Sequence, residues 1–122
     1  MEQNLQDEHL QQVEQALRKL QRDLNEEIEG LREVLESGSG ERKQYDTSER
    51  SDALQQNSMA KANLSACERR LRQVHIALRR IAEGDEDFGY CSSCDAEIPF
   101  ARLRVRPESP LCLSCQQKQE SR

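Results

Sequence analysis

The chain has 122 residues, of which 34% are hydrophobic and another 34% are charged. A chain this short and polar buries little apolar surface. We therefore expect an elongated shape, or a fold stabilised by a bound metal, in place of a large globular core. Its net charge of −5 argues against a general nucleic-acid binder, which usually carries an excess of basic residues. No stretch reaches transmembrane length and no secretion signal is visible at the N-terminus, so a cytoplasmic protein is expected.

The first predicted element is a helix over residues 3–36. Its apolar residues recur at alternating steps of three and four, at Leu10, Val13, Leu17, Leu20, Leu24, Leu31 and Val34. This is the seam of a coiled coil. Only Glu27 interrupts it, with Ile28 beside it. The glycines of residues 37–40 are expected to end the helix, because glycine weakens helices and permits turn dihedrals.

A second helix is expected to run to about Glu83, ended by Gly84. Asp46, Thr47 or Ser48 can cap its start, and Glu49 lies three residues after Asp46, as in a capping box. Its heptad seam runs through Ala53, Asn57, Ala60, Leu64, Cys67, Leu71, Val74, Leu78 and Ile81. Two helices of similar length joined by a short loop pair as an antiparallel hairpin, so residues 1–84 are predicted to form a coiled coil whose tip is the loop 37–46.

Three further expectations concern this hairpin. A turn centred near residue 42 would place Glu27 opposite Asn57, in a polar layer that fixes the register of the helices. Cys67 is expected to be a small buried hydrophobe on the seam. The arginines within residues 69–80 are expected to form salt bridges and a solvated face beside the acidic first helix, and not a nucleic-acid patch.

Four cysteines in the last third of the chain have the spacing of a metal site. Cys91 and Cys94 form one Cys-x-x-Cys pair, Cys112 and Cys115 form another, and 17 residues separate the pairs. This doubled spacing is typical of a structural four-cysteine zinc site, with one Zn²⁺ per chain and no position left for a catalytic water. Iron in the same site, a redox dithiol and two disulfides are the alternatives, of which the last needs an oxidising compartment.

Residues 85–122 are therefore predicted to be a small zinc-finger module. Pro99, Pro107 and Pro110 indicate loop or short extended structure between the cysteine pairs, and a short terminal helix is expected over residues 114–119. The predicted fold class is mainly α: a long antiparallel coiled-coil hairpin followed by this module. The chain lacks a nucleophile with a spaced His and carboxylate, and it lacks a phosphate loop, so it is not expected to be an enzyme.

The cysteine-rich stretch resembles the zinc-finger signature of the bacterial DksA/TraR family. The resemblance rests on residues 84–94, on Ile98, and on the pairs Arg102-Leu103 and Arg106-Pro107 before residues 111–115. Residues 51–55 are similar to the start of the second helix in that family. The resemblance implies a protein that binds bacterial RNA polymerase, not DNA, and inserts its hairpin tip into the secondary channel to change promoter-complex stability.

The resemblance also implies roles for particular residues. The family has the tip pattern Asp-x-x-Asp-x-Ala, whose aspartates align with Ser48 and Ser51 and whose alanine aligns with Ala53. The nearest acidic residues are Asp46, Glu49 and Asp52, and Asp52 is expected to be the working acid.

Some family members bind guanosine tetraphosphate through three basic residues, which align with Arg106, His75 and Gln116. A weak or absent nucleotide response is expected, because only one of the three is a permanent cation. A monomer is expected, since the hairpin satisfies its own seam. The alternative function is that of a zinc-ribbon and coiled-coil adaptor for another protein partner, with no direct effect on transcription.

Overall fold

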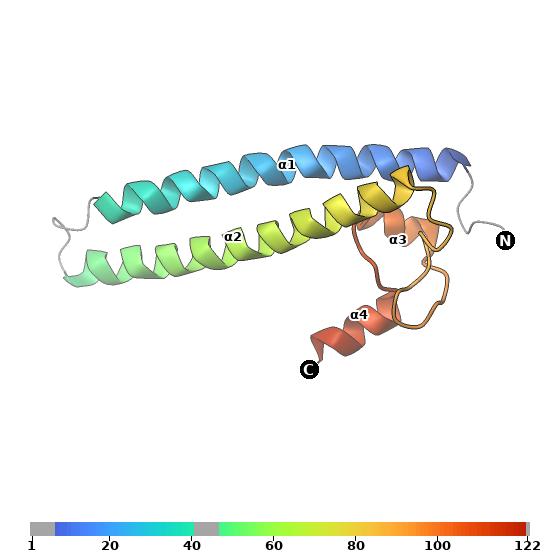
Figure 1. Cartoon of the computed structure of the whole chain (residues 1–122). Coiled ribbons are helices and arrows are strands. Elements are labelled where there is room, and N and C mark those ends of the chain that lie inside the picture. The colour runs from blue at the N-terminus through green and yellow to red at the C-terminus, as the bar shows by residue number, and fades with distance from the viewer. Residues whose placement is uncertain (1–6, 41–46, 122) are drawn as a thin grey trace. The chain divides into compact units, whose positions relative to one another are not determined.

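The computed structural model describes residues 7–40 and 47–121 of the chain. Four helices form within them: α1 (Asp7–Gly40), α2 (Thr47–Ala82), α3 (Phe100–Val105) and α4 (Leu113–Glu120) (Figure 1). The β-pairing in these ranges is limited to an isolated bridge between Tyr90 and Glu97. The mainly helical fold expected from the sequence is thus confirmed. None of the helices so described combines the length and apolar character needed to cross a membrane.

Contacts divide the chain into two compact units. Residues 1–21 and 72–122 make up the first unit, and residues 22–71 make up the second. In each unit, a stretch of α1 lies beside a stretch of α2 that runs in the opposite direction (Figure 1). The module boundary expected after Gly84 stays a prediction.

The predicted seam is buried, with one shift in α1. The most buried residues of the two long helices are Val13, Leu17, Leu24 and Ile28 on α1 and Ala60, Cys67, Val74 and Ala77 on α2, and all but Ile28 and Ala77 lie on the predicted seam. Glu27 is exposed and Ile28 replaces it, while Val34 is 54% exposed although the heptad pattern places it on the seam. Leu17 and Ile28, both buried, are 11 positions apart, which corresponds to three turns of 3.67 residues each. Because a left-handed supercoil requires a spacing of 3.5 residues per turn, this stretch of α1 is locally unwound.

The expected polar layer between Glu27 and Asn57 is wrong. Glu27 is hydrogen-bonded to the thiol of Cys67. The side chain of Arg32 lies 3.9 Å from that of Glu68. Ten residues separate Asn57 from Cys67, and this is about 15 Å along a helix, so Glu27 cannot face Asn57.

The ends of the helices differ from expectation in two places. α1 continues through the glycines of residues 37–40 to Gly40, where a loop was expected. Glycine costs only about 1 kcal/mol in a helix interior, so it does not force a stop. The segment between the cysteine pairs contains α3, which begins directly after Pro99, where loop or extended structure was expected. The terminal helix is confirmed as α4.

α2 ends in a Schellman motif. The amide of Gly84 donates to the carbonyl of Ile81 at 3.1 Å, and the amide of Asp85 donates to that of Arg80 at 3.0 Å. Gly84 has a φ of 69°, which suits glycine. The chain therefore turns sharply out of α2 and leads directly into the first cysteine pair.

Candidate metal centre

The first cysteine pair lies on a tight turn. The amide of Cys91 donates to the carbonyl of Ala96 at 2.8 Å, and the amide of Asp95 donates to the carbonyl of Cys91 at 2.9 Å. Asp95 has a φ of 63°, a left-handed conformation that Asp tolerates better than most residues. The amide of Ser93 points at the Cys91 sulfur, 3.4 Å away. The turn thus directs backbone N–H groups and both sulfurs toward one side.

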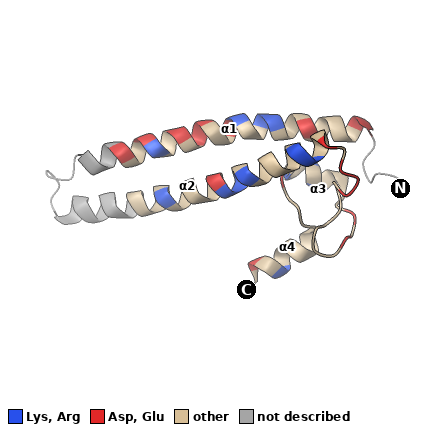
Figure 2. Cartoon of the chain, in the orientation of Figure 1, with Lys and Arg blue, Asp and Glu red and all other residues tan. Residues whose placement is uncertain are grey.

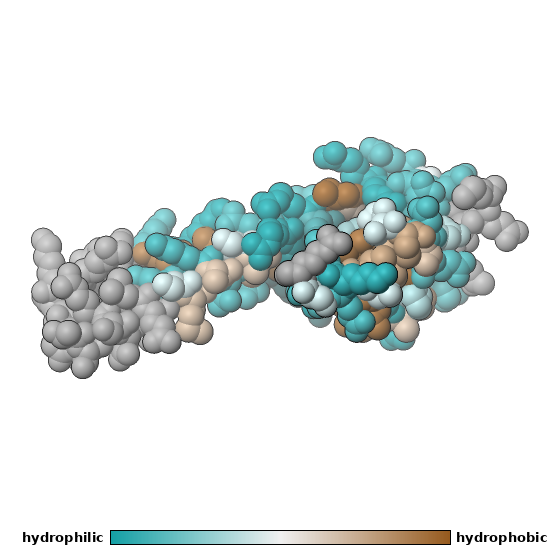
Figure 3. Space-filling model, turned by 90° about the horizontal axis from the view of Figure 1, so that it is seen from below, coloured by the Kyte–Doolittle hydropathy of each residue, from teal (hydrophilic) through white to brown (hydrophobic). Residues whose placement is uncertain are grey.

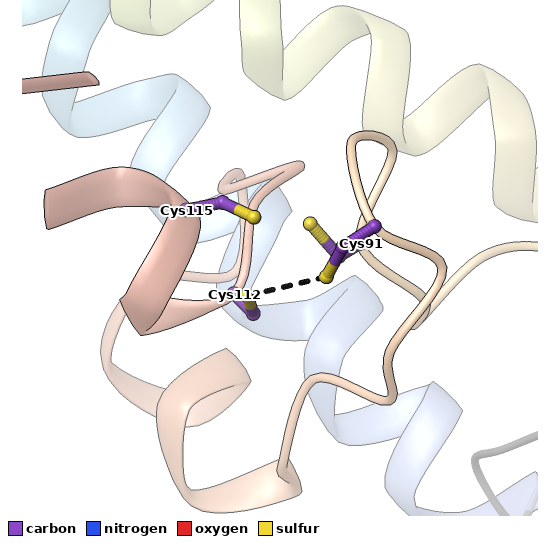
Figure 4. Close-up of side chains that lie close together, drawn as sticks. Cys91, Cys112 and Cys115 are labelled. Atoms are coloured by element: carbon purple, nitrogen blue, oxygen red, sulfur yellow. Dashed lines mark hydrogen bonds between the residues drawn. The ribbon is translucent and has the colours of Figure 1, made fainter. Parts of the chain in front are cut away.

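The second pair is positioned by α4. Cys112 is the residue before its first turn, and Cys115 lies within that turn (Figure 4). The amide of Gln116 donates to the carbonyl of Cys112 at 2.9 Å. A further hydrogen bond of 2.9 Å, from the amide of Ser92 to the carbonyl of Pro110, ties the two pairs together.

The four cysteine sulfur atoms lie close together around a common centre. All lie within 4.8 Å of one another, and the sulfurs of Cys94 and Cys112 are 3.7 Å apart. Figure 4 shows the side chains of Cys91, Cys112 and Cys115 directed toward a common centre. A tetrahedral zinc ion with Zn–S bonds of about 2.3 Å needs sulfurs about 3.8 Å apart, so the cluster fits zinc. All four thiols are free of disulfide bonds.

The electrostatics of the cluster favour a bound cation. Burial acts to raise the pKa of Cys91, but hydrogen bonds from the backbone of Cys112, Cys94 and Ser93 outweigh it and lower that pKa to about 6. The backbone of Cys115 likewise lowers the pKa of Cys112. The neighbouring sulfurs of Cys112, Cys94 and Cys91 raise the pKa of Cys115 to about 12. Four adjacent thiolates need a positive charge between them, and zinc would supply it.

The cysteines therefore form a closed zinc site of the structural kind. Four thiolate ligands complete the tetrahedron, so the metal holds the fold together and performs no catalysis. Cys91, Ile98 and Leu103 are each 1% exposed and form the small core around the site.

Three contacts that fix the module were not visible in the sequence. His9 of α1 stacks on Phe100 of α3, with ring centroids 3.9 Å apart and planes 13° from parallel. The guanidinium of Arg104 lies 5.9 Å from the centroid of the same Phe100 ring. Arg80 of α2 donates to Asp85 at 2.8 Å. A separation of 91 positions along the chain gives no local signal for the pair formed by His9 and Phe100.

The structure describes the predicted residues of the hairpin tip only in part. Asp46 lies outside the described residues. Glu49, Asp52 and Ala53 belong to the first two turns of α2, where the structure describes the backbone alone. These residues stay a prediction.

The two residues predicted to contact a nucleotide lie on different elements of the first unit. His75 is exposed on α2, and Arg106 is exposed directly after α3. Within the described ranges, no hydrogen bond or ion pair joins His75 to Arg106. Their role also stays a prediction.

The sequence similarity to known proteins includes the zinc module. Residues 86–121 match the family model of the prokaryotic dksA/traR C4-type zinc finger. The RNA polymerase-binding transcription factor DksA of Buchnera aphidicola is 42% identical over 52 residues, which make up 43% of this chain and 33% of that protein. The proteins of the same name from Escherichia coli K12 and Salmonella typhimurium are 40% identical over 52 residues, with the same shares of each chain. The chain thus matches about a third of the length of these curated relatives.

The fold extends the likeness beyond the zinc module. The structure of transcription factor DksA2 from Pseudomonas aeruginosa superposes with a TM-score of 0.72, covering 94% of this chain and 85% of that one. Its sequence is 23% identical, so this comparison shows a shared fold. Residues 86–121 thus match a zinc finger of the dksA/traR type, and the chain as a whole shares its fold with transcription factor DksA2.

Proposed function

We propose that the chain is a non-enzymatic transcription regulator that binds bacterial RNA polymerase. The observation that carries the proposal is the four-cysteine module, whose sequence relatives are named RNA polymerase-binding transcription factors. A closed zinc site is consistent with a protein that binds and does not catalyse. The polymerase is therefore the partner to test first.

The proposed mechanism is insertion of the tip between α1 and α2 into the secondary channel of the polymerase. Two long paired helices are narrow enough to enter a channel, and a carboxylate at the tip would act as a strong local charge near the Mg²⁺ of the polymerase active site. Asp52, directly before Ala53, is the proposed working acid, with Asp46 and Glu49 nearby. Such an acid would change the stability of promoter complexes.

The tip of this chain departs from the family pattern, and the proposal includes a consequence. Ser48 and Ser51 stand where the family has aspartates. The regulator is therefore proposed to act more weakly than a protein with both acids, or to occupy the channel and exclude other factors. Its response to guanosine tetraphosphate is proposed to be weak, because Gln116 and His75 stand where the family has lysines and, of the three aligned residues, Arg106 alone is a permanent cation.

The test is multi-round transcription from a ribosomal promoter with purified RNA polymerase, with Asp52→Asn compared against wild type. Wild type is expected to change transcript yield, and Asp52→Asn is expected to lose most of that change while still competing with a second channel-binding factor. Asp23→Asn is the matched control, since Asp23 is an exposed aspartate of α1 far from the tip in sequence.

Three other outcomes would decide between functions. Competition without any effect on transcription identifies a channel occupant with an inactive tip. An effect that survives in Asp52→Asn refutes the assigned acid. A wild-type protein that neither competes nor changes transcription is an adaptor for another partner, and the polymerase proposal is then rejected.

A further inference from the structure

A cavity of about 620 Å³ lies beside the first cysteine pair, within the first unit. Its lining comes from the end of α2 and from the loop that follows, and it includes Arg80, Asp85, Asp87, Tyr90, Cys91 and Asp95. Pockets that bind small organic molecules have volumes of about 300–1,000 Å³. The cavity is therefore large enough for a small molecule.

The lining of the cavity carries an excess of negative charge. Arg80 is already engaged, because its guanidinium makes a 2.8 Å ion pair with Asp85 and lies 5.5 Å from the centroid of the Phe88 ring. Asp87 and Asp95 are exposed, and in the described part of the chain neither carboxylate makes a hydrogen bond or an ion pair. Figure 2 shows the acidic residues along the loop that leaves α2. Both carboxylates are thus available to an incoming cation.

The metal centre adds to this negative charge. Cys91, which lines the cavity, is one of the four cysteines whose sulfurs fit a zinc ion. A zinc ion with four thiolate ligands keeps a net negative charge, because the charges of the ligands outweigh that of the metal. This charge is independent of the aspartates, and it too favours a cation in the cavity.

The backbone around the cavity is fixed before any ligand binds. The amide of Tyr90 donates to the carbonyl of Asp87 at 3.1 Å, and the amide of Asp95 donates to the carbonyl of Cys91 at 2.9 Å. An isolated β-bridge pairs Tyr90 with Glu97. Because these bonds hold the segment that carries both aspartates, a ligand needs to order little of the loop when it binds.

Tyr90 gives the cavity an apolar surface as well. It is half-buried, and it is the aromatic member of the lining. An ammonium group is attracted to the face of an aromatic ring. Figure 3 shows hydrophobic and hydrophilic residues side by side at the end of the molecule that carries α3 and α4. A lining that combines carboxylates with an aromatic ring suits an organic cation better than Mg²⁺ or Ca²⁺, which bind through oxygen ligands.

We propose that this cavity binds an aliphatic diamine, with its two ammonium groups paired with Asp87 and Asp95 and its carbon chain against Tyr90. The two available carboxylates match the two positive charges, and the aromatic ring matches the apolar chain between them. A divalent metal ion would bring the charge without the apolar contact. The inference goes beyond the proposed function and does not depend on it, because it concerns the chain without polymerase.

The test is the binding of the four-carbon diamine putrescine to the zinc-loaded full-length protein, followed by the NMR chemical shifts of backbone amides at constant pH and ionic strength. Putrescine is expected to shift the amides of residues 85–95 in a saturable way. Asp87→Asn and Asp95→Asn are each expected to weaken binding at least about fivefold, because each removes one charge pair. Asparagine at position 95 keeps the backbone, since Asn also tolerates the left-handed conformation found there.

The matched control is Asp23→Asn, which changes an exposed aspartate of α1 that lies outside the first unit and is expected to bind as wild type does. Tyr90→Leu is expected to weaken putrescine binding, because it removes the ring and leaves the carboxylates. Butanediol, the uncharged analogue of putrescine, is expected to cause no shift. Zinc content and thermal melting establish that each variant is folded.

The results that contradict the inference are equally specific. Wild-type affinity in both Asp87→Asn and Asp95→Asn would overturn it, and so would the absence of saturable shifts in the wild type. Equal shifts from MgCl₂ and putrescine at the same ionic strength would show general attraction of cations to an acidic loop, and the diamine site is then rejected. The same conclusion follows if putrescine shifts the acidic residues of α1 as strongly as residues 85–95.

Discussion

At the scale of single residues, two glycines have opposite effects on the helices. Gly84 ends α2 with a φ of 69°, which L-residues adopt only at a cost. Gly30 lies in the interior of α1 and has open space where a Cβ would be. Gly84 also has open space at its Cβ position, so any cost of a substitution there comes from the backbone and not from a clash.

Gly84→Ala is therefore expected to lower the free energy of unfolding by about 1 kcal/mol, the cost of holding alanine in the left-handed region. Gly30→Ala is expected to raise it by about 0.5–1 kcal/mol, because alanine loses less backbone entropy in a helix. Urea unfolding followed by circular dichroism, with zinc present, measures both. A neutral Gly84→Ala variant would mean that α2 does not end in the left-handed cap.

Cys67 is a residue whose surroundings make a prediction about pH. It is 8% exposed on the seam of α2, and burial, the charge of Glu27 and the hydrogen bond with Glu27 raise the pKa of its thiol. A raised pKa means that the folded protein keeps the proton at a pH where the unfolded chain has lost it. The stabilisation is thus complete below the unfolded pKa of about 8.5 and is lost as pH rises through the folded pKa.

Wild type is therefore expected to lose stability relative to Cys67→Val as pH rises above about 8.5, and the difference between them should be constant at lower pH. Urea unfolding of both proteins from pH 7 to 10.5 provides the measurement, and the comparison cancels the titration of every other group. Glu27→Gln should reduce the divergence, because it removes the carboxylate charge beside the thiol. Parallel stability curves for wild type and Cys67→Val would contradict the buried, carboxylate-bonded thiol.

At the scale of the helices, the sequence predicts well where the two long helices are, but it predicts poorly which of their residues face each other. The apolar period identifies α1 and α2 because burial of a seam dominates helix pairing. It misplaces Val34, because a strict heptad would bury Glu27, and the structure buries Ile28 in its place. Burying a carboxylate costs more free energy than a local change in helix winding does. The heptad pattern records only where apolar residues recur, so it does not show which of these two costs decides the register.

The same limit explains the two errors at helix ends. α1 runs through Gly38 to Gly40, since helix propensity is a weak preference that surrounding structure overrides. α3 begins after Pro99, because proline is tolerated at the start of a helix although it breaks the interior. Gly84 was correctly predicted as a stop. Composition alone does not distinguish a glycine with a left-handed dihedral from one within a helix.

At the scale of the whole molecule, the zinc site was predictable and its support was not. The ligands are two local pairs, and their spacing carries the geometry directly. The contact that stacks His9 on Phe100 joins distant parts of the chain, and the contact of Arg80 with the Phe88 ring spans the turn that follows α2. Such contacts depend on tertiary structure, so no pattern in the sequence indicates them. They imply that the zinc module is held partly by the paired ends of α1 and α2.

Removal of zinc is expected to unfold the module and to spare most of the paired helices. α3 and α4 contain 6 and 8 residues, against 34 and 36 in α1 and α2, so a strong chelator should reduce the helical circular dichroism signal by only about a sixth. Cys115→Ser is expected to lose bound zinc, since three ligands remain, whereas Cys67→Val should retain one zinc per chain in a colorimetric assay. Full zinc retention by Cys115→Ser would refute the four-ligand site. Loss of most of the helical signal on chelation would instead show that the seam of α1 and α2 is not stable without the module that packs on its ends.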